Sequence, residues 1–273
     1  MTANALIREA VLGGISASRG SITPRYDDEW VMLVAPLGLQ EAPLTPWDAL
    51  LLNAKSAGQA KLVLPSGGGA IEIRAELPAS DEPRLADRVR RACREMQQLG
   101  AMAAGADAAG EAGTSSRQSS EEGLAPEGSD LAAIAAEGGW NSIPRSNGRL
   151  AFDLETPGQF QQAVIGPHGG DLRALATLAV VRGLSARSRR ASAELLLAVA
   201  GIVRLVRAGA VEDQDEATLF FEVSLCGAPT AGDVDEALSA LAVGCRMAGR
   251  EVKALADAEV ARTYLAARDR DAQ

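Results

Sequence analysis

The hydrophobic and polar residues in the first half of the chain alternate between strand spacing and helix spacing. An apolar run over residues 30–36 predicts a central strand, and a threonine–proline pair then opens a predicted helix over residues 46–57. Residues 61–64 and 70–77 are separated by a glycine-rich turn, which predicts a β-hairpin. An amphipathic helix is predicted over residues 82–99.

The second half of the chain shows the same kinds of pattern, again with strands preceding helices. Strands are predicted over residues 150–155, 161–165, 172–182 and 217–225, and helices over residues 188–207, 231–249 and 250–268. Strands joined by short hairpins and followed by helices indicate an α+β fold rather than a parallel βαβ sheet.

One block of this pattern occurs twice, in residues 47–96 and in residues 192–250. Each copy contains a helix with a leucine triplet, a short apolar stretch, an alternating strand, a break near a proline and an amphipathic helix with Cys-Arg near its end. A repeated unit usually packs against its twin to bury its apolar face. We therefore expect two related units, each a small antiparallel sheet flanked by helices, packed together as a pseudo-dimer.

A change of composition divides the chain into three parts. The predicted parts are an N-terminal unit over residues 1–99, a linker over residues 100–139 rich in Ala, Gly, Ser and Glu, and a C-terminal unit over residues 140–273. Of the formal net charge of −9, residues 97–139 hold −6, because they contain one arginine and seven acidic residues. The linker is therefore the acidic part, with a transient helix predicted near residues 130–137.

Composition excludes several classes of partner and compartment. The predicted units are nearly neutral and have no basic footprint, so nucleic acid is not expected as a partner. A membrane span is not expected either, because the chain contains no apolar run of about 18 residues. Residues 3–16 form a predicted amphipathic helix without the features of a signal peptide. Three unpaired cysteines, Cys93, Cys226 and Cys245, fit a reducing compartment, and we expect the protein in the cytoplasm.

Few residues offer catalytic chemistry. His168 is the single histidine, no GxSxG nucleophile elbow accompanies it, and no cysteine pair or acidic loop has the spacing of a metal site. Ser66–Gly69 lies between two predicted strands and lacks the P-loop pattern. We expect no enzyme activity, cofactor or metal. The alternative, an enzyme with unusual chemistry, would gather Asp153, Glu155 or Asp171 with His168 in a pocket.

The two repeated strands, residues 70–77 and 217–225, are the predicted binding surface. In the first, Glu72, Arg74 and Glu76 alternate with apolar residues, so that one face is charged and the other apolar. A sheet with one face covered by helices can offer its other face or an edge to a partner chain.

A local basic cluster lies around the start of the helix that follows the third predicted strand of the second half. It consists of Arg182, Arg187, Arg189 and Arg190. It contacts an acidic partner or the acidic linker, or it is simply solvated. The predicted partner-binding residues are Ile71, Ile73, Leu219, Phe221, Val223, Arg187, Arg189 and Arg190.

The order of these elements resembles the type III secretion chaperone fold. An apolar strand that ends in Pro-Leu-Gly spans Val31–Gly38, a leucine-rich helix with an asparagine follows at Leu50–Asn53, then a hairpin at Lys61–Leu77 and a long helix at Pro83–Gln98. Residues 150–255 are similar to the bacterial sensory-transduction-regulator proteins, which share that fold.

The resemblance implies a non-enzymatic protein that holds an extended, partly unfolded segment of another protein against its sheets. Members with a single unit are dimers, so two copies in one chain would form an internal pseudo-dimer, and the protein would be a monomer or a homodimer. The alternative reading is a regulatory or defence-related adaptor whose acidic linker is cut, modified or docked.

Overall fold

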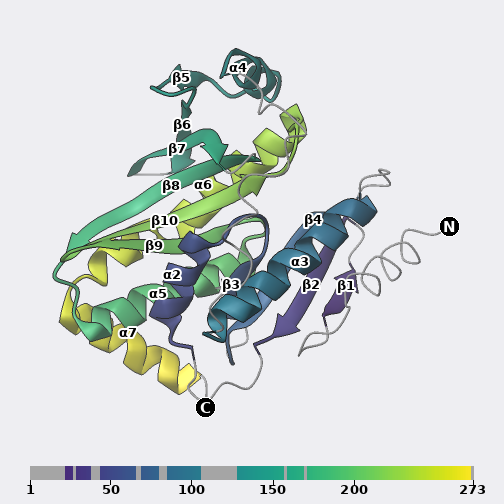
Figure 1. Cartoon of the computed structure of the whole chain (residues 1–273). Coiled ribbons are helices and arrows are strands. Elements are labelled where there is room, and N and C mark those ends of the chain that lie inside the picture. Colours follow the sequence, from purple (N-terminus) through teal and green to yellow (C-terminus); the bar gives the residue numbers. More distant parts are fainter. Residues whose placement is uncertain are drawn as a thin grey trace.

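The computed structural model confirms an α+β fold built on two antiparallel sheets (Figure 1). It describes residues 22–26, 29–37, 44–65, 69–79, 85–105, 128–156, 159–168 and 171–271. The predicted helix over residues 3–16 and most of the predicted linker lie outside these ranges.

The smaller sheet has four strands in the order β1 (Thr23–Tyr26), β2 (Trp30–Pro36), β4 (Glu72–Pro78) and β3 (Lys61–Val63). The larger sheet has six strands in the order β5 (Ser142–Pro144), β6 (Leu150–Thr156), β7 (Gln159–His168), β8 (Asp171–Arg182), β10 (Glu216–Leu225) and β9 (Arg207–Asp213). Neighbouring strands are antiparallel in both sheets.

The helices of the described residues are α2 (Pro46–Lys55), α3 (Leu85–Ala103), α4 (Gly128–Glu137), α5 (Ala186–Ile202), α6 (Ala231–Ala254) and α7 (Ala258–Asp271). Their starts follow from capping: the Thr45, Ser185 and Thr230 side chains accept hydrogen bonds from backbone N–H groups in the first turns of α2, α5 and α6. None of these helices combines the length and the apolar character needed to cross a membrane.

The two sheets share one order of connections. In the smaller sheet, α2 follows β2, the β3–β4 hairpin follows α2, and α3 follows β4; the sheet order is β2-β4-β3. In the larger sheet, α5 follows β8, the β9–β10 hairpin follows α5, and α6 follows β10; the order is β8-β10-β9. The block that occurs twice in the sequence therefore coincides with a repeated topology.

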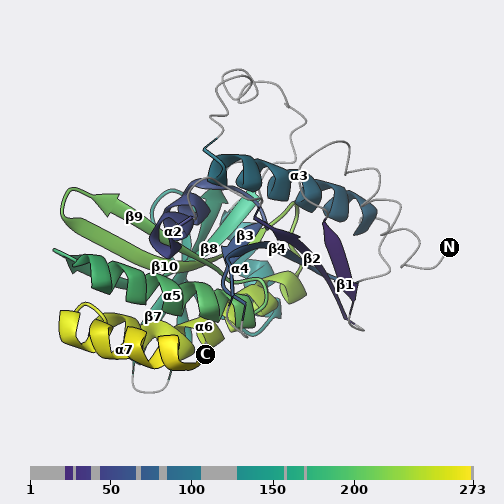
Figure 2. The ribbon, with the colours of Figure 1, turned by 90° about the horizontal axis from the view of Figure 1, so that it is seen from below.

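The helices form layers on opposite sides of the sheets. Seen from below, α2 and α3 lie on one side, and α5, α6 and α7 on the other (Figure 2). The helix α2 packs against β9 of the larger sheet, and α5 packs against β3 of the smaller one. One hydrophobic core runs through both sheets. The two halves of the chain share this core. The predicted division of the chain into three parts stays a prediction.

The prediction of a helix over residues 188–207 was wrong at its end. The helix stops at Ile202 because Val203 is extended (φ −85°, ψ 116°), and Leu205, in a left-handed conformation (φ 65°), turns the chain toward the next strand. Residues from Arg207 onward form strand β9, which was not predicted. Gly209 lies in this strand, where a Cβ would come within 2.5 Å of the Phe220 ring. The apolar residues between Ile202 and Gly209 keep a helix-compatible spacing, so the sequence shows no break there.

Both described ends of the predicted linker contain helix. Its first residues continue α3 to Ala103, and α4 occupies the place of the predicted transient helix. Leu131 and Ala135 of α4 are buried (1% and 0% exposed), and α4 packs against α6, so this helix belongs to the folded part. The short edge strands β1 and β5 were not predicted, because they lack an apolar alternation long enough to be detected.

Gly58 is required by the turn that joins α2 to β3. Its φ is +84°, and a Cβ there would lie 2.1 Å from the Glu95 carboxyl carbon, whose oxygen accepts a hydrogen bond from the Gln59 backbone N–H (2.7 Å). We predict that Gly58→Ala lowers the free energy of unfolding, measured in urea, by about 2–3 kcal/mol, from backbone strain and the displaced carboxylate.

Gly183→Ala is the matched control. Its φ is also positive (+60°), but a Cβ there would meet nothing within 4 Å, so only strain of about 1 kcal/mol is expected. Equal losses in the two variants would show that the Glu95 contact does not contribute.

Candidate interaction surface

The first strand of each repeated hairpin begins with a buried cation. In β3 this residue is Lys61, 1% exposed, whose Nζ lies 2.7 Å from Glu76 Oε2. The ammonium also donates hydrogen bonds to the backbone oxygens of Ala200 (2.8 Å) and Val206 (2.9 Å), at and beyond the C-terminal end of α5. Burial lowers the pKa of Lys61, and Glu76 opposes this shift.

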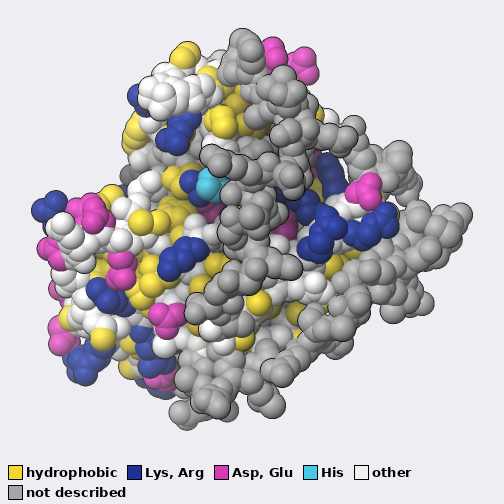
Figure 3. All heavy atoms as spheres, viewed as in Figure 1, with side chains coloured by type: hydrophobic (Ala, Val, Ile, Leu, Met, Phe, Trp, Pro, Cys, Tyr) yellow, Lys and Arg dark blue, Asp and Glu magenta, His cyan; other side chains and the backbone are white. Residues whose placement is uncertain are grey.

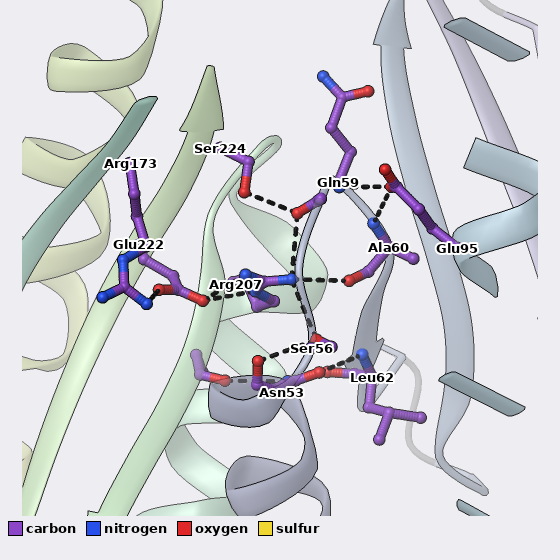
Figure 4. A network of polar contacts seen from close by, with 12 residues as sticks. Asn53, Ser56, Gln59, Ala60, Leu62, Glu95, Arg173, Arg207, Glu222 and Ser224 are labelled. Carbon is purple, nitrogen blue, oxygen red and sulfur yellow. Dashed lines mark hydrogen bonds and ion pairs between the residues drawn. The ribbon is translucent and has the colours of Figure 1, made fainter. Parts of the chain in front are cut away.

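In β9 the corresponding residue is Arg207, 3% exposed, which pairs with the fully buried Glu222 at 2.6 Å. The other side of its guanidinium donates hydrogen bonds to Ser56 Oγ (3.1 Å), Gly58 O (3.0 Å) and Ala60 O (3.2 Å), just beyond the end of α2 (Figure 4). Each hairpin cation therefore binds a glutamate of its own sheet and oxygens at or just beyond the C-terminal end of the helix of the other half.

Asn53 joins the two halves at the same place. Its side-chain amide donates to the backbone oxygens of Leu62 in β3 (3.0 Å) and Ala208 in β9 (2.9 Å), and its Oδ1 accepts from the Leu62 N–H (2.8 Å). All these groups are buried, so each must find a partner within the fold. We call Asn53, Lys61, Glu76, Arg207 and Glu222 the crossed polar network; it fixes the position of the two sheets.

A narrow cleft opens beside this network, between Arg88 of α3, β10 and the start of α6. It encloses about 430 Å³ including open solvent, and Cys226 and Glu236 lie on its wall. Burial raises the pKa of Cys226 to about 12, so its thiol is protonated and unreactive near neutral pH. Burial and nearby acidic groups, chiefly Asp233, also raise the pKa of Glu236. Among the described residues no group of three or more potential ligands is placed to hold a metal ion.

The two faces of the larger sheet are covered differently over β6, β7 and β8. The helix α6 covers one face: a Cβ on its Gly244 would lie 3.1 Å from the Phe221 ring. Glu222, next to Phe221 in the strand, points to the other face, and its register partner Leu175 pairs in turn with Val164. The residues on the same side as Glu222, Leu175 and Val164 therefore form the face of the sheet that α6 does not cover.

We call this surface the open sheet face. Its apolar members are the half-buried Val164 and Leu175 and the exposed Phe160, Val180 and Val211, which are 77%, 55% and 52% exposed. The last two both lie opposite Thr218 in the register. Figure 3 views the molecule from this side and shows hydrophobic side chains close to the single histidine. An exposed set of large apolar side chains on one face is typical of an interaction surface.

One end of the open sheet face is cationic. Gly166 of β7 lies opposite Arg173 of β8, and His168 lies opposite Asp171. The stem of Arg149 lies over Gly166, where a Cβ would be 2.6 Å from Arg149 Cγ. Burial lowers the pKa of His168, and the positive charge of Arg173 adds to this effect.

The structure places the predicted apolar site residues in the core. Ile71, Ile73, Leu219, Phe221 and Val223 are 8%, 4%, 0%, 0% and 2% exposed. They line the covered faces of their strands, so in this fold they are not available to a partner. The helices α3 and α6 occupy the apolar faces that the sequence offered for binding.

The basic cluster mostly pairs within the chain. Arg189 lies 3.2 Å from Glu212 and stacks over the Trp47 ring at 5.6 Å, and Arg190 binds Glu194 at 2.7 Å. Arg187 is exposed. Because Arg189 and Arg190 are paired with glutamates, the cluster carries less net positive charge than the sequence suggests.

Of the acidic residues in the enzyme hypothesis, only Asp171 lies opposite His168 in the register, whereas Asp153 and Glu155 are on β6. Asp171 is beside His168 in the register but binds the Arg91 guanidinium and the Gly227 N–H, while Asp153 accepts a hydrogen bond from Gln162. Glu155 lies opposite Phe160. Sequence reasoning missed Val164, Leu175 and Phe160, although the alternation along β7 and β8 was a usable signal for them.

The chain matches no protein-family model, no curated protein and no solved structure at a significant level. Function is therefore inferred from the geometry of its surfaces.

We predict that the crossed polar network is needed for stability. Lys61→Met leaves Glu76 and two backbone oxygens buried with fewer partners, and we expect it to lower the free energy of unfolding by about 3–5 kcal/mol. Lys55→Met, at the exposed end of α2, serves as the control and should cost less than about 0.5 kcal/mol. Urea unfolding of both variants decides; similar small losses would mean that the buried pair is dispensable.

We also predict the titration of His168. Because it is the single histidine in the chain, its imidazole gives one set of NMR signals, and their midpoint should lie below the ordinary 6.5. Arg173→Gln removes a nearby positive charge and should raise the midpoint, whereas Arg182→Gln, near the far end of β8, should leave it unchanged. A midpoint that responds equally to both variants would contradict the placement of Arg173 beside the imidazole.

Proposed function

We propose that the protein is a non-enzymatic scaffold that binds an extended segment of another protein across the open sheet face. The observation that carries this proposal is the set of apolar side chains on β7, β8 and β9, led by Phe160 at 77% exposure. When a partner covers such side chains, each Å² of apolar surface removed from water contributes about 25 cal/mol to binding.

The support beneath this face favours binding by a preformed surface. Leu175 lies opposite Glu222 in the register of β8 and β10. Glu222 binds Arg207, and Arg207 in turn binds the other half of the chain. A side chain held by a rigid sheet loses little entropy when a partner binds. Alternating apolar positions along neighbouring strands suit an extended segment, whose own side chains alternate.

The repeated topology supports a second part of the proposal, that the two halves form an internal pseudo-dimer. The helix α2 packs against β9 and the helix α5 against β3, so each half covers an element of the other. Three free cysteines, two of them buried, suit a reducing compartment such as the cytoplasm.

We predict that a random peptide library displayed on phage yields binders to the full chain. Leu175→Glu places a charge in the middle of the open sheet face and should weaken the selected peptides by about tenfold or more, because the charge must be desolvated on binding. Binding is measured by fluorescence anisotropy with synthetic copies of the selected peptides.

Val260→Glu is the matched control, since Val260 is also an exposed apolar residue (43%) but lies on α7. It should not change the dissociation constant. The proposal fails if no peptide is enriched, or if Leu175→Glu and Val260→Glu bind the peptides equally well.

A further inference from the structure

The two buried glutamates of the crossed polar network have different surroundings. Each is approached by two cations: Glu76 by Lys61 (2.7 Å) and Arg74 (3.6 Å), and Glu222 by Arg207 (2.6 Å) and Arg173 (3.2 Å). Two cations on one carboxylate leave a surplus positive charge, which a low-dielectric environment makes costly unless another anion is near.

In the smaller sheet this surplus is neutralised within the chain. Arg74 binds Glu72 as well, with Nη2 2.5 Å from Oε1 and Nε 3.1 Å from the same oxygen. Its Nη1 donates to Gly201 O at 2.6 Å. Lys61, Arg74, Glu72 and Glu76 therefore form a neutral group of two cations and two anions.

In the larger sheet the second anion is missing from the described part of the chain. Arg173 binds Glu222 there and no other carboxylate, and its side chain is 26% exposed on the open sheet face. Arg149, exposed and lying over Gly166, forms no ion pair among the same residues. The acidic residue closest in the register, Asp171, is already bound to Arg91 and the Gly227 N–H.

We propose that Arg173 and Arg149 bind a carboxylate of the partner segment, in the role that Glu72 plays for Arg74. This inference rests on the proposed function and names the partner's chemistry: an extended segment with an aspartate or glutamate next to apolar residues. Arg173 pairs with Gly166 in the register, one row from Val164 and Leu175, so the acidic and apolar contacts are neighbours on the sheet.

Gly166 is part of this site because it carries no side chain. A Cβ at this position would meet Arg149 Cγ at 2.6 Å and displace the arginine from the strand. The glycine thus lets the stem of Arg149 lie flat on β7, beside Arg173. Gly166→Ala is expected to weaken the carboxylate contact without removing any charge.

The experiment is a double-mutant cycle with the peptides selected against the full chain. Each acidic residue of a peptide is replaced by its amide, Asp by Asn or Glu by Gln, and the dissociation constants are compared for wild type, Arg149→Gln, Arg173→Gln and the control Arg182→Gln. For wild type and the control we expect the amide to weaken binding about tenfold, since a hydrogen bond to a charged group contributes about that much. In Arg149→Gln and Arg173→Gln the difference between acid and amide should disappear.

Two further measurements keep the test informative if the Arg173→Gln variant misfolds. Arg149 is exposed and does not contact Glu222, so its variant reports on the site even if Arg173→Gln is unstable. The pKa of the His168 imidazole responds to the charges of Arg173, Glu222, Arg207 and Asp171, and it should be higher when the acidic peptide is bound, because a carboxylate stabilises the protonated ring. The amide peptide should leave this midpoint where it is.

The inference is overturned if the selected peptides depend on Leu175 but bind equally well as acids and amides, or if Arg149→Gln and Arg173→Gln keep the full difference. Either result leaves the proposed function standing. If the library yields no peptide at all, the proposed function itself fails, and the carboxylate site fails with it.

Discussion

The fold depends on an exchange of buried charge between its two halves. Lys61 and Arg207 open the first strands of the two hairpins, and each reaches across to backbone oxygens at or just beyond the end of the helix of the other half. A buried cation costs several kcal/mol unless it is paired and hydrogen-bonded, so neither half satisfies its own hairpin alone. This requirement ties the orientation of the sheets to two side chains, because hydrogen bonds are directional and apolar burial is not.

The same constraint decides which surfaces remain uncovered. The helix α2 lies over β9, where Asn53 binds Ala208, and α6 lies on the other face, where it contacts Phe221. Among the residues that the structure describes, the open sheet face is the part of the larger sheet that these two helices leave uncovered. Its exposed apolar residues are thus a result of the way the halves interlock, and the cationic end near Arg173 arises where the network reaches the surface.

Sequence patterns predicted the helices and most strands, since those depend on local periodicity and capping. The strand over residues 30–36 and the helix starts after Thr45 and Thr230 were confirmed. Charge placement was not predictable in the same way. Arg74 and Glu76 alternate with apolar residues and so suggest a solvent-facing side, yet they are 8% and 5% exposed because the other half of the chain covers them. A single strand's alternation reports two faces, but not which of them a distant segment will bury.

The separation of the network partners along the chain bears on synthesis. Lys61 can pair with Glu76 early, but its backbone acceptors lie 139 and 145 residues later in the chain, so a ribosome has produced most of the polypeptide before the ammonium can complete its hydrogen bonds. At about 5–20 residues per second, the first hairpin waits several seconds to tens of seconds for its acceptors. During that interval the Lys61 ammonium can keep its remaining hydrogen bonds only with water, so the complete burial of the first hairpin has to wait for the second half of the chain.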